Sequence, residues 1–212
     1  MPFTLAHPIA ALPLWWGSQR RLDLTALMIG ATIPDISYFI ALQPVANIGH
    51  QFSGIFLEGI PSAFALLLIG KYVLWQPVMQ LLPRAIAQRF PRRCPYRILP
   101  VSRLLMITLS IALGAATHIV WDNFTHYRGW GVNRIGLLSH EVLNLPIYKW
   151  LQHSGGLIGF ALILLFAYQA FRTLESRYQH STSSLKTLPI SWKVFAGGAI
   201  SSITILTIFT AL

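Results

Sequence analysis

The chain has 212 residues, of which 54% are hydrophobic and only 10% are charged, and its formal net charge is +10. Soluble domains carry about 25% charged residues, so this composition excludes an ordinary soluble domain and favours a polytopic membrane protein. The positive charge could indicate nucleic-acid binding, but the chain has no nucleic-acid-binding motif and its basic residues cluster between apolar stretches. We therefore expect membrane lipids as partners and no nucleic acid. The lone cysteine, Cys94, excludes an intramolecular disulfide.

Five apolar stretches are long enough to cross a bilayer, which takes roughly 20 helical residues. They lie near residues 23–42, 52–75, 103–124, 154–173 and 192–212. A shorter apolar stretch, residues 3–16, is expected to form an N-terminal half-helix or re-entrant segment. Pro34 and Asp35 predict a break in the first span. The expected fold is all-α, a single integral membrane domain over residues 1–212 built as a transmembrane helix bundle of about five spans.

The basic residues predict how the spans are oriented. Thirteen of the 16 Lys and Arg residues fall on one side of the five spans. The positive-inside rule then places residues 76–102 and 173–192 in the cytoplasm, and residues 43–51 and 125–153 outside the cell membrane. Residues 76–102 form a basic cytoplasmic loop, which either contacts anionic lipid headgroups or is a solvated segment that only sets the orientation.

Five metal-ligand side chains lie within or beside the apolar stretches: His7, Asp35, His50, His118 and Asp122. Ionisable groups at bilayer depth are costly and mark functional sites, and a mixture of imidazole and carboxylate is typical of zinc sites. The rise of about 1.5 Å per helical residue, counted from flanking arginines, places His7, Asp35 and His118 in the outer half of the membrane. His50 starts the second span on that same side, so four separate elements present a ligand at one level. The sequence therefore predicts a site for one or two divalent ions, zinc or manganese, that neutralise the carboxylates.

The stretch THIVWDNFTH gives the most specific local pattern. His118 and Asp122 are four residues apart, so they share one helix face and can converge on one ion. His126 follows one turn later and would continue this face if the helix persists. His153, just before the fourth predicted span, is a further candidate ligand. The alternative is a structural Asp–His pair inside a helix bundle.

Candidate catalytic and substrate-binding residues lie around these ligands. Asp35 and Glu58 are candidate general bases, and Glu58 could also be a further ligand. Arg128 and Arg134, both predicted outside, could bind a phosphate group or simply lie on the surface.

The segments MPFTLAHP, IGATIPD, GHQFSGIFLEGIP, THIVWDNFTH and LQHSGG together resemble an uncharacterised bacterial membrane family, domain-of-unknown-function family 4184. More distantly, the chain resembles the membrane-bound metal-dependent hydrolases. The order His, Asp, His, His-x-x-x-Asp is similar to zinc-dependent phospholipase C and the P1-type nucleases. That resemblance implies that Asp35, His50, His118 and Asp122 hold one metal and that His7 helps Asp122 to hold another.

Two features depart from the soluble enzymes, which use their N-terminal amine and a late His-x-x-x-Glu helix as ligands. Here Met1 and Pro2 precede His7 by several residues, and Leu157 follows four residues after His153. One or two ions are therefore expected rather than three.

The expected function is a membrane-embedded metal-dependent hydrolase, related in mechanism to phosphodiesterases, that acts on an ester or phosphoester of an amphiphile at the outer leaflet. Two alternatives stay open. The first is an ion, proton or metal transporter, since intramembrane Asp and His also build ion pathways. The second is a non-catalytic membrane protein with a structural metal.

Overall fold

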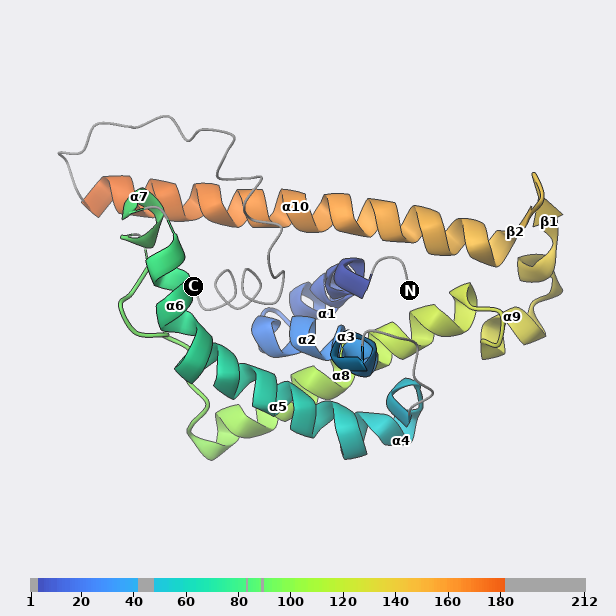
Figure 1. Ribbon diagram of the computed structural model, residues 1–212, viewed down its shortest axis with the longest axis horizontal. Coiled ribbons are helices and arrows are strands. Elements are labelled where there is room, and N and C mark those ends of the chain that lie inside the picture. The colour runs from blue at the N-terminus through green and yellow to red at the C-terminus, as the bar shows by residue number, and fades with distance from the viewer. Residues whose placement is uncertain (1–3, 42–47, 83, 89, 182–212) are drawn as a thin grey trace. The chain divides into compact units, whose positions relative to one another are not determined.

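Helices make up most of the computed structural model (Figure 1), which describes residues 4–41, 48–82, 84–88 and 90–181. The α-helices are α1 (Leu12–Gly17), α2 (Leu24–Gly30), α3 (Ile36–Ala41), α4 (Phe52–Gly54), α5 (Ile60–Ile69), α6 (Trp75–Leu81), α7 (Arg84–Ala87), α8 (Val101–Thr125), α9 (Trp130–Arg134) and α10 (Ile147–Ser181). Short 3-10 helices cover Thr4–Ala11, Ile33–Asp35, Ile48–His50 and Gly136–Ser139, and π-helical turns cover Ile55–Gly59 and Gly70–Leu74. The strands β1 (Glu141–Val142) and β2 (Leu145–Pro146) form a small antiparallel hairpin.

Four helical segments are long and apolar enough to cross a membrane: Leu24–Ala41, Phe52–Leu81, Val101–Arg134 and Ile147–Ala170. They overlap the first four predicted spans, and the all-α transmembrane fold class is confirmed. The fifth predicted span, residues 192–212, lies outside the described residues. Helix α10 begins at Ile147, seven residues before the predicted start of the fourth span, because the preceding hairpin leads directly into it.

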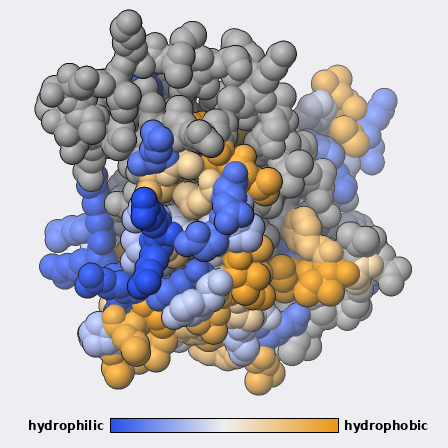
Figure 2. Space-filling view, turned by 60° about the vertical axis from the view of Figure 1, so that its left-hand side comes forward, coloured by the Kyte–Doolittle hydropathy of each residue, from blue (hydrophilic) through white to orange (hydrophobic). Residues whose placement is uncertain are grey.

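Large apolar side chains on these helices point outward. Exposed examples on the four segments are Ile40, Leu57, Leu105 and Leu157. On the face drawn in Figure 2, hydrophobic residues form a broad area next to a band of hydrophilic ones. A soluble fold rarely exposes apolar patches of this extent, so the outward apolar surface fits a lipid environment.

The chain forms two compact units. The first comprises Met1–Ala65 and Ile98–Ile163, and the second comprises Leu66–Arg97 and Leu164–Leu212. In the second unit, Trp75 packs edge-on against Phe90 and donates from Nε1 to the carbonyl oxygen of Pro91 at 3.3 Å. Helix α6 and this contact give the predicted basic loop a folded start. Burial raises the pKa of the Cys94 thiol in the same cluster, which disfavours its thiolate form.

The first unit is built on a close crossing of α2 and α8. A Cβ atom at Gly30 would overlap the backbone of Ile111, and one at Gly114 would overlap the carbonyl oxygen of Leu27. Small residues allow two helix backbones to touch in this way, and such contacts are typical of membrane helices. The 3-10 helix Thr4–Ala11 packs against both helices. The crossing therefore brings residues 4–35 beside residues 107–122.

One end of this crossing is fixed by polar contacts. Asp23 caps α2 by accepting from the backbone N–H of Ala26 at 2.9 Å, and its own N–H donates to Oγ of Ser110 at 2.9 Å. The second carboxylate oxygen pairs with Arg103 Nη2 at 3.0 Å. These contacts set the register of α2 along α8, since Ser110 and Arg103 lie on α8. The two ligand candidates of α8 lie toward its other end.

Candidate metal centre

Five side chains from four separate elements meet inside the first unit. Three short 3-10 helices contribute His7, Asp35 and His50, and α8 contributes His118 and Asp122. Nε2 of His50 lies 3.0 Å from Oδ1 of Asp35 and 3.6 Å from Oδ2 of Asp122. Nε2 of His118 lies 3.6 Å and 3.3 Å from the same two oxygens. Nε2 of His7 lies 3.8 Å from Oδ1 of Asp122. The structure thus brings together the five residues that the sequence grouped.

The cluster contains two overlapping sets of three side chains whose ligand atoms lie within 4.8 Å of one another. One set is His7, His118 and Asp122, and the other is Asp35, His50 and His118. Each set offers two imidazoles and one carboxylate, and three protein ligands are what catalytic zinc sites provide. Because His118 belongs to both sets, the geometry suits one ion, or two ions that lie close together near His118.

His118 is fully buried and held by the backbone of α2. Its Nδ1 lies 2.8 Å from the carbonyl oxygen of Ala31, the residue that caps the glycine-packed end of that helix. A carbonyl only accepts, so Nδ1 carries the proton and Nε2 of the neutral ring is left with its lone pair. This outer hydrogen bond is the device by which proteins orient metal-binding histidines. Nε2 of His118 accordingly faces the two carboxylates.

Two buried atoms of the cluster have no hydrogen-bond partner within the described part of the chain: Nε2 of His118 and Oδ1 of Asp122. An unpartnered buried polar atom costs about 1–3 kcal/mol, and more for a charged group. Native structures rarely keep such atoms without an explanation, of which a bound ion is one. Both atoms belong to the set that also contains His7.

The other ligands are also positioned from behind. Thr4 donates from Oγ1 to Oδ2 of Asp35 at 2.5 Å, which leaves Oδ1 turned toward the histidines. The ring of His7 stacks on that of His118 with centroids 4.0 Å apart. Burial, helped by the neighbouring His118, lowers the pKa of His7 to about 4. His7 is therefore neutral at pH 7 and can offer a lone pair, but it does not neutralise Asp122.

The two carboxylates of the cluster have histidines as their ion-pair partners. Every ion-pair contact made by Asp35 and Asp122, among residues that the structure describes, is with a histidine. A divalent cation held between Asp35 and Asp122 would offset the charge of the two carboxylates.

His126 lies beside the cluster in a different role from the one its spacing predicted. Helix α8 ends at Thr125, so His126 follows the helix and its ring does not continue the ligand face. Lys149 donates from Nζ to Oε1 of Gln152 at 2.9 Å, and Nε2 of Gln152 lies 2.8 Å from Nε2 of His126. Since an amide nitrogen only donates, Nε2 of His126 accepts, and the neutral ring carries its proton on Nδ1. That Nδ1 lies 3.3 Å from the backbone carbonyl oxygen of Asp122 and 3.2 Å from Oγ1 of Thr125, so His126 donates to the end of α8.

The remaining candidates lie apart from the two sets of three. His153 is exposed on α10, because the neighbouring Gln152 occupies the inward face. Glu58 is half-buried in a π-helical turn and makes no ion pair or hydrogen bond within the described ranges. Arg128 and Arg134 are exposed, and the guanidinium of Arg134 lies 5.7 Å from the ring centre of Trp130.

Sequence reasoning missed the residues that support the ligands. Thr4, Gln152 and Lys149 are contacts of this kind, and the Ala31 carbonyl has no side-chain signal at all. One signal was present on α8, where a residue every fourth position forms a stripe: Ser110, Gly114, His118 and Asp122. A small residue one turn before a buried histidine indicates that another backbone approaches there.

The fold and the cluster together define a helical protein of membrane-spanning character with a buried histidine–aspartate site. The family described as a domain of unknown function (DUF4184) matches residues 1–211, so the chain belongs to this family. Comparison with curated proteins and with solved structures gave no match.

Proposed function

We propose that this protein is a membrane-embedded, metal-dependent hydrolase that cleaves an ester or phosphoester of an amphiphilic substrate. His7, Asp35, His50, His118 and Asp122 would hold one or two divalent ions, with zinc favoured by the donor types and manganese as the alternative. The observation that carries this proposal is the state of His118. Its Nδ1 is bound to the Ala31 carbonyl, and its buried Nε2 faces two carboxylates without a hydrogen-bond partner among described residues.

The chemistry follows from the donors. A divalent ion in this position would supply a water molecule whose pKa is lowered toward about 7. A carboxylate must then accept the proton. Both oxygens of Asp35 are engaged, one by Thr4 and one by His50, whereas Oδ1 of Asp122 accepts no hydrogen bond within the described chain. Asp122 would hold the ion through Oδ2, which faces His50 and His118, and accept the proton on Oδ1, whereas Asp35 has the contacts of a ligand only.

Position supports a substrate drawn from the outer leaflet of the cell membrane. His118 and Asp122 lie in the last two turns of α8, at the end opposite Arg103. The excess of Lys and Arg on the Arg103 side assigns that side to the cytoplasm by the positive-inside rule. The resemblance of the ligand order to zinc-dependent phospholipase C and the P1-type nucleases favours a phosphoester among the candidate esters.

The test compares two histidines of the same protein. Wild type, His118→Ala and the exposed control His153→Ala are purified in detergent, and bound metal is measured by mass spectrometry. Hydrolysis of bis(4-nitrophenyl) phosphate and 4-nitrophenyl butyrate is followed in parallel. We expect stoichiometric metal and hydrolysis in wild type and His153→Ala, and loss of both in His118→Ala. A wild type without stoichiometric zinc or manganese, or hydrolysis that His118→Ala leaves unchanged, contradicts the proposal.

One observation favours transport as a second candidate function. The first span is interrupted beside a ligand: α2 ends at Gly30, α3 begins at Ile36, and Pro34 and Asp35 lie between them. Transporters use such discontinuous helices to build ion sites near the middle of the bilayer. Zinc flux into proteoliposomes without hydrolysis of either ester would establish transport instead. Loss of folding on chelation, with neither flux nor hydrolysis, would indicate a structural metal.

A further inference from the structure

The hairpin at residues 141–146 has an unusual turn. Glu141 pairs with Pro146 and Val142 pairs with Leu145, which leaves Leu143 and Asn144 as a two-residue loop. Both loop residues have positive φ, 52° and 62°, as a type I′ turn requires. Such turns favour Asn-Gly or Asp-Gly, because residues with a branched or bulky side chain are strained at positive φ. Leucine at the first position is therefore an outlier.

The side chain of Leu143 gives no packing in return for this strain. It is 80% exposed, more than nearly every other large apolar side chain of the described chain. A strained backbone position that persists without an internal contact points to a function, by inference from the outlier. Because leucine offers only an apolar surface, the missing partner of Leu143 is apolar.

The hairpin is held at the level where a membrane-crossing helix starts. The backbone N–H of Ile147, the first residue of α10, donates to the carbonyl oxygen of His140 at 3.0 Å. Trp150 in the first turn of α10 donates from Nε1 to the carbonyl oxygen of Val142 at 2.9 Å. The hairpin thus lies beside the first turn of a span, as the ribbon around β1, β2 and α10 shows (Figure 1).

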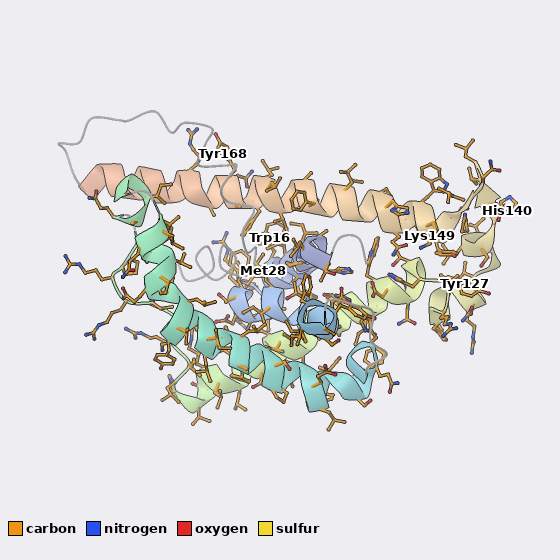
Figure 3. All side chains as sticks on the ribbon, in the orientation of Figure 1. Trp16, Met28, Tyr127, His140, Lys149 and Tyr168 are labelled. Carbon is orange, nitrogen blue, oxygen red and sulfur yellow. The ribbon has the colours of Figure 1, made fainter. Side chains whose placement is uncertain are left out.

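The surroundings of the hairpin have the composition of a membrane interface. Exposed aromatic side chains gather on the connecting segments, namely Tyr127, Trp130 and Trp150. Tyr127, His140 and Lys149 mark this end of the first unit in Figure 3. Trp and Tyr concentrate at the level of lipid headgroups in membrane proteins. Below them, buried Val132, Leu138 and Tyr148 hold α9 and the start of α10 together, so the hairpin stands on a packed base.

We propose that the hairpin at residues 141–146 inserts Leu143 into the adjoining lipid leaflet, with the phospholipid bilayer as its partner. The aromatic residues would lie at headgroup level and Leu143 would reach the acyl chains. The exposed Glu141, at the base of the hairpin, would stay in the headgroup region. The inference rests on the turn and its exposure and is independent of the metal centre.

The test measures the depth of one side chain. Because Cys94 is the lone cysteine, Cys94→Ser gives a cysteine-free background in which Leu143→Cys is spin-labelled and placed in nanodiscs of phosphatidylcholine, which offer the basic loop no anionic headgroups. Collision with oxygen reports lipid, and collision with a water-soluble nickel chelate reports water. Leu157→Cys, on an exposed apolar site of α10, gives the lipid reference, and Arg92→Cys in the basic loop gives the aqueous reference.

We expect the label at position 143 to collide with oxygen in preference to the nickel chelate, as at position 157. A preference for the chelate, as at position 92, would overturn the proposal. Low collision with both reagents would indicate contact with another protein surface and would overturn it equally. Leu143→Asn serves as a folding control: because it suits the turn and removes no internal contact, the thermal unfolding temperature in detergent should stay the same or rise.

Discussion

Helices α8 and α10 are both long and apolar, yet they differ in how many of their residues are buried. In the most apolar window of each span, 39% of the residues are buried for the α8 segment and only 11% for the α10 segment. Helix α8 turns Ser110, Gly114, His118 and Asp122 inward, whereas α10 exposes leucines such as Leu157. Ionisable groups are therefore tolerated on α8 because protein, and not lipid, surrounds them. The helix that carries the ligand side chains is therefore the one that is packed against another helix backbone.

The largest effect is expected from adding a side-chain carbon where α2 and α8 touch. In Gly114→Ala the new Cβ overlaps the carbonyl oxygen of Leu27, so the helices must separate. We expect a loss of about 3 kcal/mol in the free energy of unfolding, at the upper end of the range for overpacking. Unfolding in mixed detergent, followed by tryptophan fluorescence, measures it. Gly136→Ala is the matched control, because nothing lies within 4 Å of its Cβ and it should unfold as wild type does. Equal stability of the two variants would mean that the glycine contact does not hold the crossing.

When one buried carboxylate is neutralised, the change in the free energy of unfolding should have opposite signs in chelator and in zinc. Asp122→Asn removes a charge whose burial costs up to about 3 kcal/mol, so in chelator the variant should be more stable than wild type. With zinc at about one thousand times its dissociation constant, wild type should gain about 4.1 kcal/mol and become the more stable protein. Thermal unfolding in chelator and in zinc measures both. Asp23→Asn, which keeps an amide able to cap α2 and leaves the five ligands unchanged, should gain as much stability from zinc as wild type does. The same stability order in both conditions would argue against a bound cation.

A smaller effect, on metal affinity, is expected from residues that hydrogen-bond to the ligands. Thr4→Val removes the hydrogen bond to Oδ2 of Asp35 while keeping the shape of the side chain. Supporting residues of this kind contribute about 10–100-fold to metal affinity. Competition with a zinc-binding dye measures the dissociation constant. Thr108→Val is the control, because that hydroxyl bonds only within α8, to the carbonyl oxygen of Leu104 at 3.0 Å. Matching affinities in both variants would show that Asp35 needs no support.

The smallest effect on the free energy of unfolding is expected at the N-terminal end of α8, where Arg103 pairs with Asp23. The side chain of Arg103 is 44% exposed, so its pair with Asp23 should contribute less than about 1 kcal/mol. Asp23→Ala also removes the cap of α2 and should cost about 1 kcal/mol more. Unfolding of Arg103→Gln and Asp23→Ala, alone and combined, separates the two terms. If Arg103→Gln is the more harmful change, the ion pair and not the cap fixes this end.

Local patterns were sufficient for much of the architecture. Four of the five predicted spans follow from apolar runs long enough to cross a bilayer, and the break at Pro34 follows from the missing backbone N–H. Grouping His7, Asp35 and His50 with the α8 pair needed only helical rise and the expense of charge in lipid. These arguments work because depth along a helix is proportional to position in the chain.

The direction in which a side chain points around the helix axis is a different quantity, and the sequence was less informative about it. His126 was expected to extend the ligand face, but α8 ends one residue earlier and Gln152 takes up the Nε2 of its ring. His153 was expected as a further ligand, but its side chain is exposed, and the adjacent Gln152 is the buried residue. A displacement of one residue turns a side chain by about 100°, so an argument from depth cannot separate these neighbours.

The amino-acid sequence by itself determined that the chain is helical, crosses an apolar phase several times and carries His and Asp side chains at one depth. It did so because hydrophobicity and helical rise are properties of single segments. Only the tertiary structure decided that the Ala31 carbonyl fixes the Nδ1 proton of His118, which leaves Nε2 directed at Asp35 and Asp122. That contact joins residues 87 positions apart and exists because Gly30 and Gly114 let two backbones touch, which no single segment encodes.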